Sequence, residues 1–212
     1  MKLPLFPLKS VFFPGETVPL HIFEPRYKEL IRDCMEEALT FGIPVFIDNT
    51  ISHGTEVQLI EVVNTYDNGE MDVLCLARQV FRVLSFVNPM GGKLYPGGEV
   101  AFLDMEYRAD ARIRGEVLLG LEQLYRLMDL PFASLDRERF NSYTLAHKMG
   151  LSLAQEFELL KMARETDRLL FVREHLERTI TLLDQINHTK ANIELNGHFK
   201  NFDPLNFKGL EI

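Results

Sequence analysis

The sequence predicts an α+β protein: a small barrel-like sheet with one helix, then a bundle of helices, then an extended C-terminal tail. Before about residue 110, prolines, glycines and short β-type runs dominate the chain. From there to about residue 186, apolar residues recur at helical spacing. From residue 187 onwards this periodicity fails. We therefore divide the 212 residues into a β-subdomain at 1–110, a helical subdomain at 111–186 and a tail at 187–212.

The first segments of the chain combine extended structure with a single helix. Residues 3–8 contain two prolines and fit an edge strand or an extended segment, because proline donates no ladder hydrogen bond. Pro25 suits the first position of a helix. This helix has one apolar stripe and would end at Gly42, before a short apolar strand at 43–47. The stripe consists of Tyr27, Leu30, Ile31, Cys34 and Ala38.

A hairpin is the clearest local signal in the sequence. Its strands are residues 57–65 and 71–76, and the Asn-Gly pair at 68–69 supplies the positive φ angles of a tight turn. Residues 79–86 alternate as another strand, and residues 99–107 form the last one. Several short, sequential strands with one helix favour a closed or nearly closed barrel-like sheet.

Helical patterns fill the second half. Apolar positions mark a helix at 113–128, and Ser142 can cap a short helix that Gly150 ends. A capping box at 152–155 opens the next helix, and the last helix has its apolar stripe at 169–183. Each helix has one apolar stripe, so these helices must pack together or on the sheet.

The charge balance argues against nucleic-acid binding. Asp and Glu outnumber Lys and Arg by 31 to 23, which gives a net charge of −8 and a pI near 5.3. A protein that binds phosphates normally carries a basic patch or stripe. Every basic run in this chain is mixed with acids, so general nucleic-acid binding is disfavoured.

Cysteine usage and hydropathy predict a cytoplasmic protein. Cys34 and Cys75 fit buried thiols in a reducing compartment better than a disulfide framework. Prolines and Lys9 interrupt the apolar N-terminal stretch, which is not followed by a small-residue cleavage site. No run of 18 uncharged apolar residues occurs, so we expect no membrane segment.

The sequence lacks the patterns of catalytic, metal and cofactor sites. Its histidines form no H-E-x-x-H motif, and its cysteines form no C-x-x-C pair. Nucleophile-elbow and phosphate-loop motifs are also absent. Glu24 and Arg26 stand at a predicted helix start, which explains both without catalysis. We therefore expect no catalytic residue, metal or cofactor. The histidines are His21, His53, His147, His175, His188 and His198.

Phe12 and Phe13 are the candidate peptide-binding residues. They precede Pro14-Gly15, where the chain must turn. Neighbouring side chains diverge in an extended segment, so one ring can enter the core while the other adds to an apolar binding patch. The competing interpretation, which has slightly more in its favour, is that the helical half buries both rings.

Three motifs near the N-terminus together resemble the opening signature of the substrate-binding (LON) domain of Lon proteases. They are Leu-Pro-Leu-Phe-Pro-Leu at 3–8, Phe-Pro-Gly at 13–15 and Pro-Leu-His-Ile-Phe-Glu-Pro-Arg-Tyr at 19–27. Weaker similarities extend the resemblance over residues 3–186. They lie at His53-Gly54, Asp67-Asn-Gly69, Phe81-Arg-Val83, Tyr95, residues 99–103, Ala146, residues 156–160 and Thr166-Asp-Arg-Leu169.

The resemblance implies a PUA-like β-subdomain followed by a helical bundle, and a role in recognising protein substrates. We expect a stand-alone, non-catalytic copy without ATPase and peptidase modules. Its partners would be unfolded or partner protein segments and a separate protease or chaperone. An RNA-binding module is the alternative, because PUA-like folds also bind RNA, although the acidic balance disfavours it. A residual hydrolase is a third hypothesis for the function, and no motif supports it.

Overall fold

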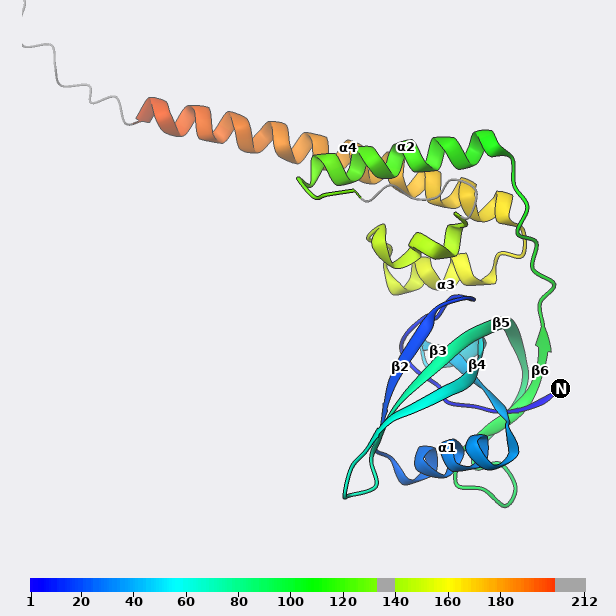
Figure 1. The fold of residues 1–212 in the computed structure, drawn as a ribbon. Coiled ribbons are helices and arrows are strands. Elements are labelled where there is room, and N and C mark those ends of the chain that lie inside the picture. Colours follow the sequence, from blue (N-terminus) through cyan, green and yellow to red (C-terminus); the bar gives the residue numbers. More distant parts are fainter. Residues whose placement is uncertain (133–139, 201–212) are drawn as a thin grey trace, which may run out of the picture.

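The alternating runs of the first hundred residues form a six-stranded antiparallel sheet. The computed structural model describes residues 1–132 and 140–200, with 194–200 as backbone only (Figure 1). The sheet follows the order β1-β6-β5-β4-β3, and β2 pairs with β5. The strands are β1 (Lys2–Pro4), β2 (Thr17–Ile22), β3 (Thr40–Ile47), β4 (Thr50–Thr65), β5 (Met71–Val87) and β6 (Gly97–Phe102).

The segment after β1 joins the two ends of this sheet. Leu5 bridges to Gly42 and Leu8 to Val45, so β1 and β3 are linked and the sheet curls upon itself. The amide of Phe6 donates to the carbonyl of Gly42 at 2.8 Å. This curled sheet confirms the α+β architecture and the barrel-like sheet expected from the sequence.

The predicted hairpin is present, with a wider turn than expected. β4 and β5 pair from Thr65 and Met71, and the turn between them closes through a hydrogen bond from the Tyr66 amide to the Glu70 carbonyl. Within it, Gly69 alone has a positive φ, of 75°. β5 also continues through residues that were expected to form two strands, because bulges in its pairing let it bend without ending.

The first helix, α1 (Pro25–Glu37), ends earlier than predicted. Ala38 takes the left-handed conformation that closes it, with φ of 53°. Gly42 lies within β3 instead. A Cβ at this position would stand 2.6 Å from the Phe81 ring, which belongs to β5. The role of Gly42 is therefore close packing of two strands.

One face of α1 is buried against the inner side of the curled sheet, and it carries four members of the predicted stripe: Tyr27, Leu30, Ile31 and Cys34. Ala38, the fifth, is exposed and follows the helix. Cys34 on α1 and Cys75 on β5 are both free and buried in this cluster, as expected. Burial raises the pKa of each thiol to about 12, so both thiols stay protonated at neutral pH. Packing in the core therefore accounts for both cysteines.

The helical half contains α2 (Ala111–Leu127), the 3-10 helix η1 (Ser142–Lys148), α3 (Leu153–Lys161) and α4 (Glu165–Lys200). Asp110 caps α2, and the predicted capping box opens α3. The N-cap of η1 is Asn141, whose side chain accepts from two amides, and not Ser142 as expected. Ser142 is instead buried in the polar network described below.

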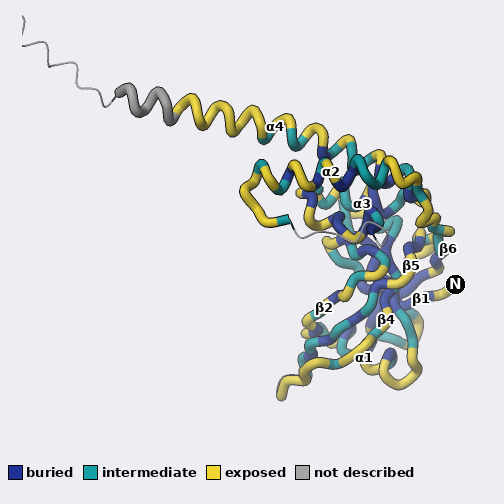
Figure 2. Tube along the Cα trace, turned by 45° about the horizontal axis from the view of Figure 1, so that its top comes forward, coloured by how far each residue is buried: buried dark blue, intermediate teal, exposed yellow. Residues whose placement is uncertain are grey.

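The prediction of an extended tail from residue 187 is wrong for residues up to Lys200, because α4 continues to that residue. Loss of the apolar stripe means that the helix has no burial partner, whereas residues such as Lys190 and Ala191 still favour helix. Figures 1 and 2 show this stretch of α4 projecting beyond α2, with an exposed surface up to residue 193. Residues 201–212 lie outside the described part. The last strand also ends at Phe102, short of the predicted 107.

A buried ion pair organises the start of α4. Arg168 and Glu165 are both fully buried, with their charged atoms 2.8 Å apart. The Glu165 carboxylate accepts from the amide and hydroxyl of Ser142, each at 2.8 Å. Arg168 also donates to the carbonyls of Met162, Ala163 and Glu106. The pair thus links α4, η1 and the segment leaving β6.

Replacing Gly54 with alanine should disrupt the sheet, because the new Cβ would stand 2.3 Å from the Ile43 carbonyl oxygen. We expect a loss of about 2–3 kcal/mol in the free energy of unfolding, measured in urea. Gly91→Ala is the control, since nothing lies within 4 Å of its added Cβ. Equal stability of the two variants would contradict the close approach of β3 and β4.

Arg168→Met should destabilise the protein by about 3–5 kcal/mol, because it leaves the buried Glu165 carboxylate without its cation. Arg164→Ala, in the same turn, removes an exposed ion pair with Asp167 and should cost under about 1 kcal/mol. Denaturant unfolding of both variants measures the difference, and a cost for Arg168→Met no larger than the control would refute a structural role for the pair.

Candidate functional site

Strands β2, β5 and β4 lie side by side and present a common outer face to solvent. Pro19 on β2 pairs with Leu74 on β5, and Leu74 pairs with Glu61 on β4. Directly paired residues point to the same side of a sheet, and Val73, next to Leu74, is buried inside. Leu74 therefore points outward. By the same register the outward row includes Thr17, Leu76 and Gln58.

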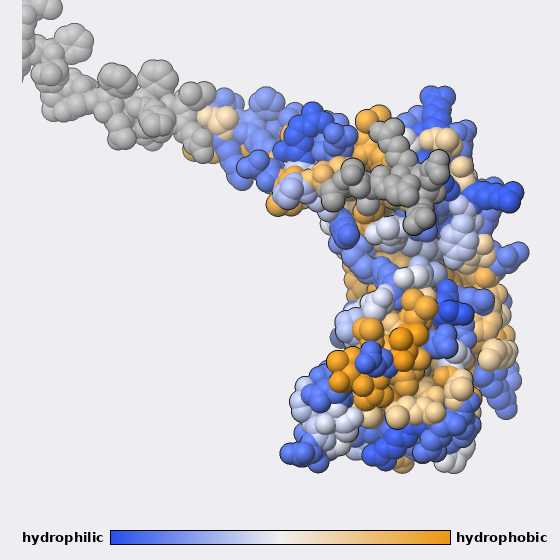
Figure 3. Space-filling model, viewed as in Figure 1, coloured by the Kyte–Doolittle hydropathy of each residue, from blue (hydrophilic) through white to orange (hydrophobic). Residues whose placement is uncertain are grey.

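Two bulges in β4 add apolar side chains to this face. The register shifts between Leu59 and Glu61 and again between Val62 and Asn64. The extra residues, Ile60 and Val63, are 55% and 61% exposed. Figure 3 shows strongly hydrophobic atoms gathered over the strands of the β part on this side. We call Pro19, Ile60, Val63, Leu74 and Leu76 the outer apolar face.

The turn end of the outer face carries a polar and aromatic cluster. The Nδ1 atom of His21 lies 2.7 Å from Asp72, and its Nε2 atom lies 3.3 Å from Glu70. The Tyr66 hydroxyl donates to the other Asp72 oxygen at 2.6 Å. The Asp72 carboxylate raises the pKa of His21, and hydrogen bonds from Tyr66 and His21 lower the pKa of Asp72. The rings of Phe23 and Tyr66 flank His21.

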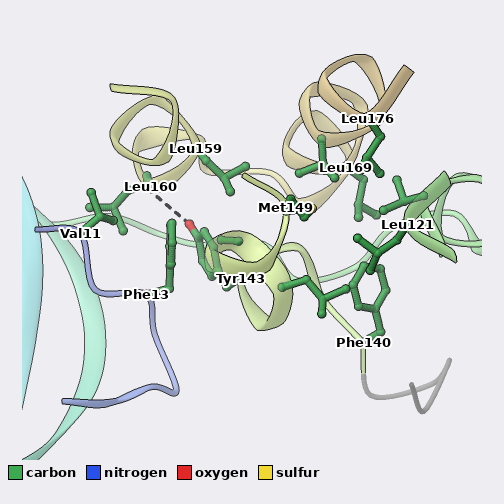
Figure 4. Packing of buried hydrophobic residues seen from close by; sticks show 14 of the residues in the cluster. Val11, Phe13, Leu121, Phe140, Tyr143, Met149, Leu159, Leu160, Leu169 and Leu176 are labelled. Carbon is green, nitrogen blue, oxygen red and sulfur yellow. Dashed lines mark hydrogen bonds between the residues drawn. The ribbon is translucent and has the colours of Figure 1, made fainter. Parts of the chain in front are cut away.

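The structure separates the two sequence candidates, Phe12 and Phe13. Phe13 is fully buried, and its ring stacks on Tyr143 of η1 with centroids 4.9 Å apart (Figure 4). Phe12 is half-buried against the core of the β part, and its carbonyl accepts from the Thr55 hydroxyl. The two rings diverge, and Phe13 joins the β part to the helices. Only Phe12 keeps accessible surface.

His147 forms a charged contact between the β part and the helices. Its ring is tilted against that of Phe13, and its nitrogens lie 2.7 Å from Glu156 on α3 and 3.3 Å from Glu16, just before β2. Glu16 also accepts from the Phe13 amide at 2.8 Å. The two carboxylates, Glu16 first, raise the pKa of His147 to about 9. At neutral pH a cation therefore lies between two anions from different parts of the chain.

Within the described residues, the remaining sequence candidates take part in local polar contacts. No group of three or more His, Cys, Asp or Glu side chains there is arranged to hold a metal ion. Arg26 pairs with Glu24 at 2.7 Å and lies over the Tyr27 ring, which fits the structural interpretation. His188 contacts Asp184. The side chain of His198 lies outside the described part.

Sequence reasoning missed the outer apolar face, although one signal for it was present. Residues 73–77 are apolar at every position, whereas a strand with one solvated face normally alternates. Val73, Cys75 and Ala77 fill the interior, so the intervening Leu74 and Leu76 had to lie on the opposite face.

The chain thus combines a curled sheet, which has an apolar outer face, with a small helical bundle. Residues 2–178 match the family model of the ATP-dependent protease La (LON) substrate-binding domain. The chain therefore belongs to the LON substrate-binding domain family, as its N-terminal motifs indicated. This membership supports a substrate-binding role.

Two solved structures share this fold. The Lon N-terminal domain protein from Xanthomonas campestris is 30% identical, with a TM-score of 0.59 over 80% of this chain and 95% of that one. The N-terminal domain of the Mycobacterium avium complex Lon protease is 17% identical, with a TM-score of 0.60 over 84% of this chain and 98% of that one. At that identity the second similarity concerns the fold alone.

The contact of His147 with Glu16 and Glu156 should make stability depend on pH. The pKa of His147 is higher in the folded protein than its ordinary value of 6.5. Its stabilisation is therefore complete below about pH 6.5 and is lost as pH rises through about 9. We expect the stability difference between the wild type and His147→Gln to shrink from pH 6 to pH 9.5 in urea unfolding. A constant difference across that range would contradict the charged contact.

Proposed function

We propose that this chain is a non-catalytic module that holds apolar segments of other proteins on its outer apolar face. The observation that carries the proposal is the exposure of Ile60 and Val63 beside Leu74 and Leu76 on one continuous surface. Contiguous exposed apolar surface is costly for a soluble protein, and where it occurs it typically marks an interaction site. Membership of the substrate-binding family supports the same role.

The free edge of β2 favours recognition by side chains over strand addition. The Ala77 amide donates to the Glu16 carbonyl, so Glu16 faces β5. Backbone groups alternate in direction along a strand, and Pro19 therefore faces the free edge. Proline has no amide hydrogen to offer an added strand. A client segment would consequently lie across the face and insert its apolar side chains there.

Delivery of the bound segment to a separate protease or chaperone is the second part of the proposal. The helical half presents another surface for such a partner, because α4 projects well beyond the β part (Figure 1). Buried free thiols fit a reducing compartment, and we place this role in the cytoplasm. No helix in the described residues is long and apolar enough to cross a membrane. Phe12 is half-buried against the core of the β part and remains a candidate contact.

Ile60→Glu should weaken binding of an apolar peptide, because it places a charge within the contact. We expect the Kd of a fluorescent apolar peptide to rise about tenfold, measured by anisotropy. Leu119→Glu is the matched control, since Leu119 on α2 is 62% exposed and lies away from the sheet. Circular dichroism confirms that both variants fold. Equal losses in both variants, or no binding by the wild type, would refute the proposed face.

A further inference from the structure

We propose that the outer apolar face selects segments that carry Lys or Arg beside their apolar residues, with the basic side chain placed at the turn end next to the exposed rings of Phe23 and Tyr66. This inference rests on the proposed function and names the class of client. It follows from the distribution of charge along the face and from the aromatic residues at one end of it.

The charge of the outer face is concentrated at its turn end. Glu61 pairs with Leu74 in the apolar row, Asp72 lies two residues before Leu74 on β5, and Glu70 lies in the turn. Among the paired outward positions of the three strands, from Thr17 to Leu76, no Lys or Arg occurs. The first basic residue along β5 is Arg78, at the opposite end.

The acids at this end exceed the local positive charge. His21 contacts both Asp72 and Glu70, so one imidazole balances at most one of two carboxylates. Glu61 adds a third, exposed carboxylate. Lys28, on α1, adds one ammonium through its bond to the Asn68 carbonyl, and the three carboxylates still outnumber these two basic groups. An incoming ammonium or guanidinium therefore meets a net negative field next to the apolar face, and a carboxylate is repelled.

Aromatic rings provide a second feature suited to a cation. Phe23 is 58% exposed and Tyr66 is 42% exposed. Their ring centroids lie 6.1 and 6.0 Å, respectively, from that of His21. Such exposed rings offer their faces to a Lys or Arg head group, while the aliphatic stem of that side chain covers apolar surface. The same end of the face thus presents acids, ring faces and adjoining Ile60 and Val63, which together fit a basic residue beside an apolar run.

The experiment compares three peptides that share one apolar run and differ only at one flank, which is Lys-Lys, Gln-Gln or Glu-Glu. We expect the Lys peptide to bind about 2- to 5-fold more tightly than the Gln peptide, and the Glu peptide to bind most weakly. Added salt should reduce the differences in Kd between the three peptides, because it screens exposed carboxylates. Anisotropy with the full chain provides the readout.

Variants assign the preference to the turn end. Glu61→Gln combined with Glu70→Gln should abolish the advantage of the Lys peptide over the Gln peptide. Glu122→Gln, an exposed acid on α2, should leave the order unchanged. Equal binding of all three peptides, or a preference that survives the double variant, overturns this inference and leaves the proposed function standing. Binding of none of them overturns both.

Discussion

The arrangement of the sheet depends on strand β5, which forms hydrogen bonds with three other strands along its 17 residues. Its first half lies between β2 and β4, and its second half pairs with β4 and then β6. Both edges of the first half are paired, and its side chains alternate between the two faces of the sheet. The inner face fills the core under α1, and no described element covers the outer one. The curl of the sheet and the outward position of Leu74 and Leu76 thus both depend on β5, while bulges in β4 add Ile60 and Val63 to the face.

The contact between the β part and the helices combines apolar stacking with charge. Phe13 and Val80 belong to the same buried cluster as the helices, so the core continues across the two parts (Figure 4). His147 adds a cation between carboxylates from both sides. These contacts use the Phe13 ring for structure, which is why it is absent from the surface.

An exposed apolar face favours self-association, and several features around this one oppose it. The chain is acidic overall, so copies repel one another. Pro19 removes a donor from the free edge of β2, and the bulges in β4 break its regular ladder. The carboxylates of Glu61 and Asp72 border the apolar residues. These features disfavour pairing of sheet edges while leaving the side chains of the face open to a bound segment.

The sequence by itself determined the kinds of element and much of their order. The hairpin, the helix that begins at Pro25 and the capping box at Ser152 depend on interactions within a few residues, and the N-terminal motifs indicated the family. Tertiary structure decided which surfaces were covered. Nothing local distinguishes Phe12 from Phe13, or shows that Leu74 faces water while Val73 does not. The physical reason is that periodicity reports how apolar residues are spaced, whereas burial depends on distant segments that come to pack on them. The length of α4 is the converse case, since a helix without a burial partner keeps its backbone hydrogen bonds but loses its apolar stripe.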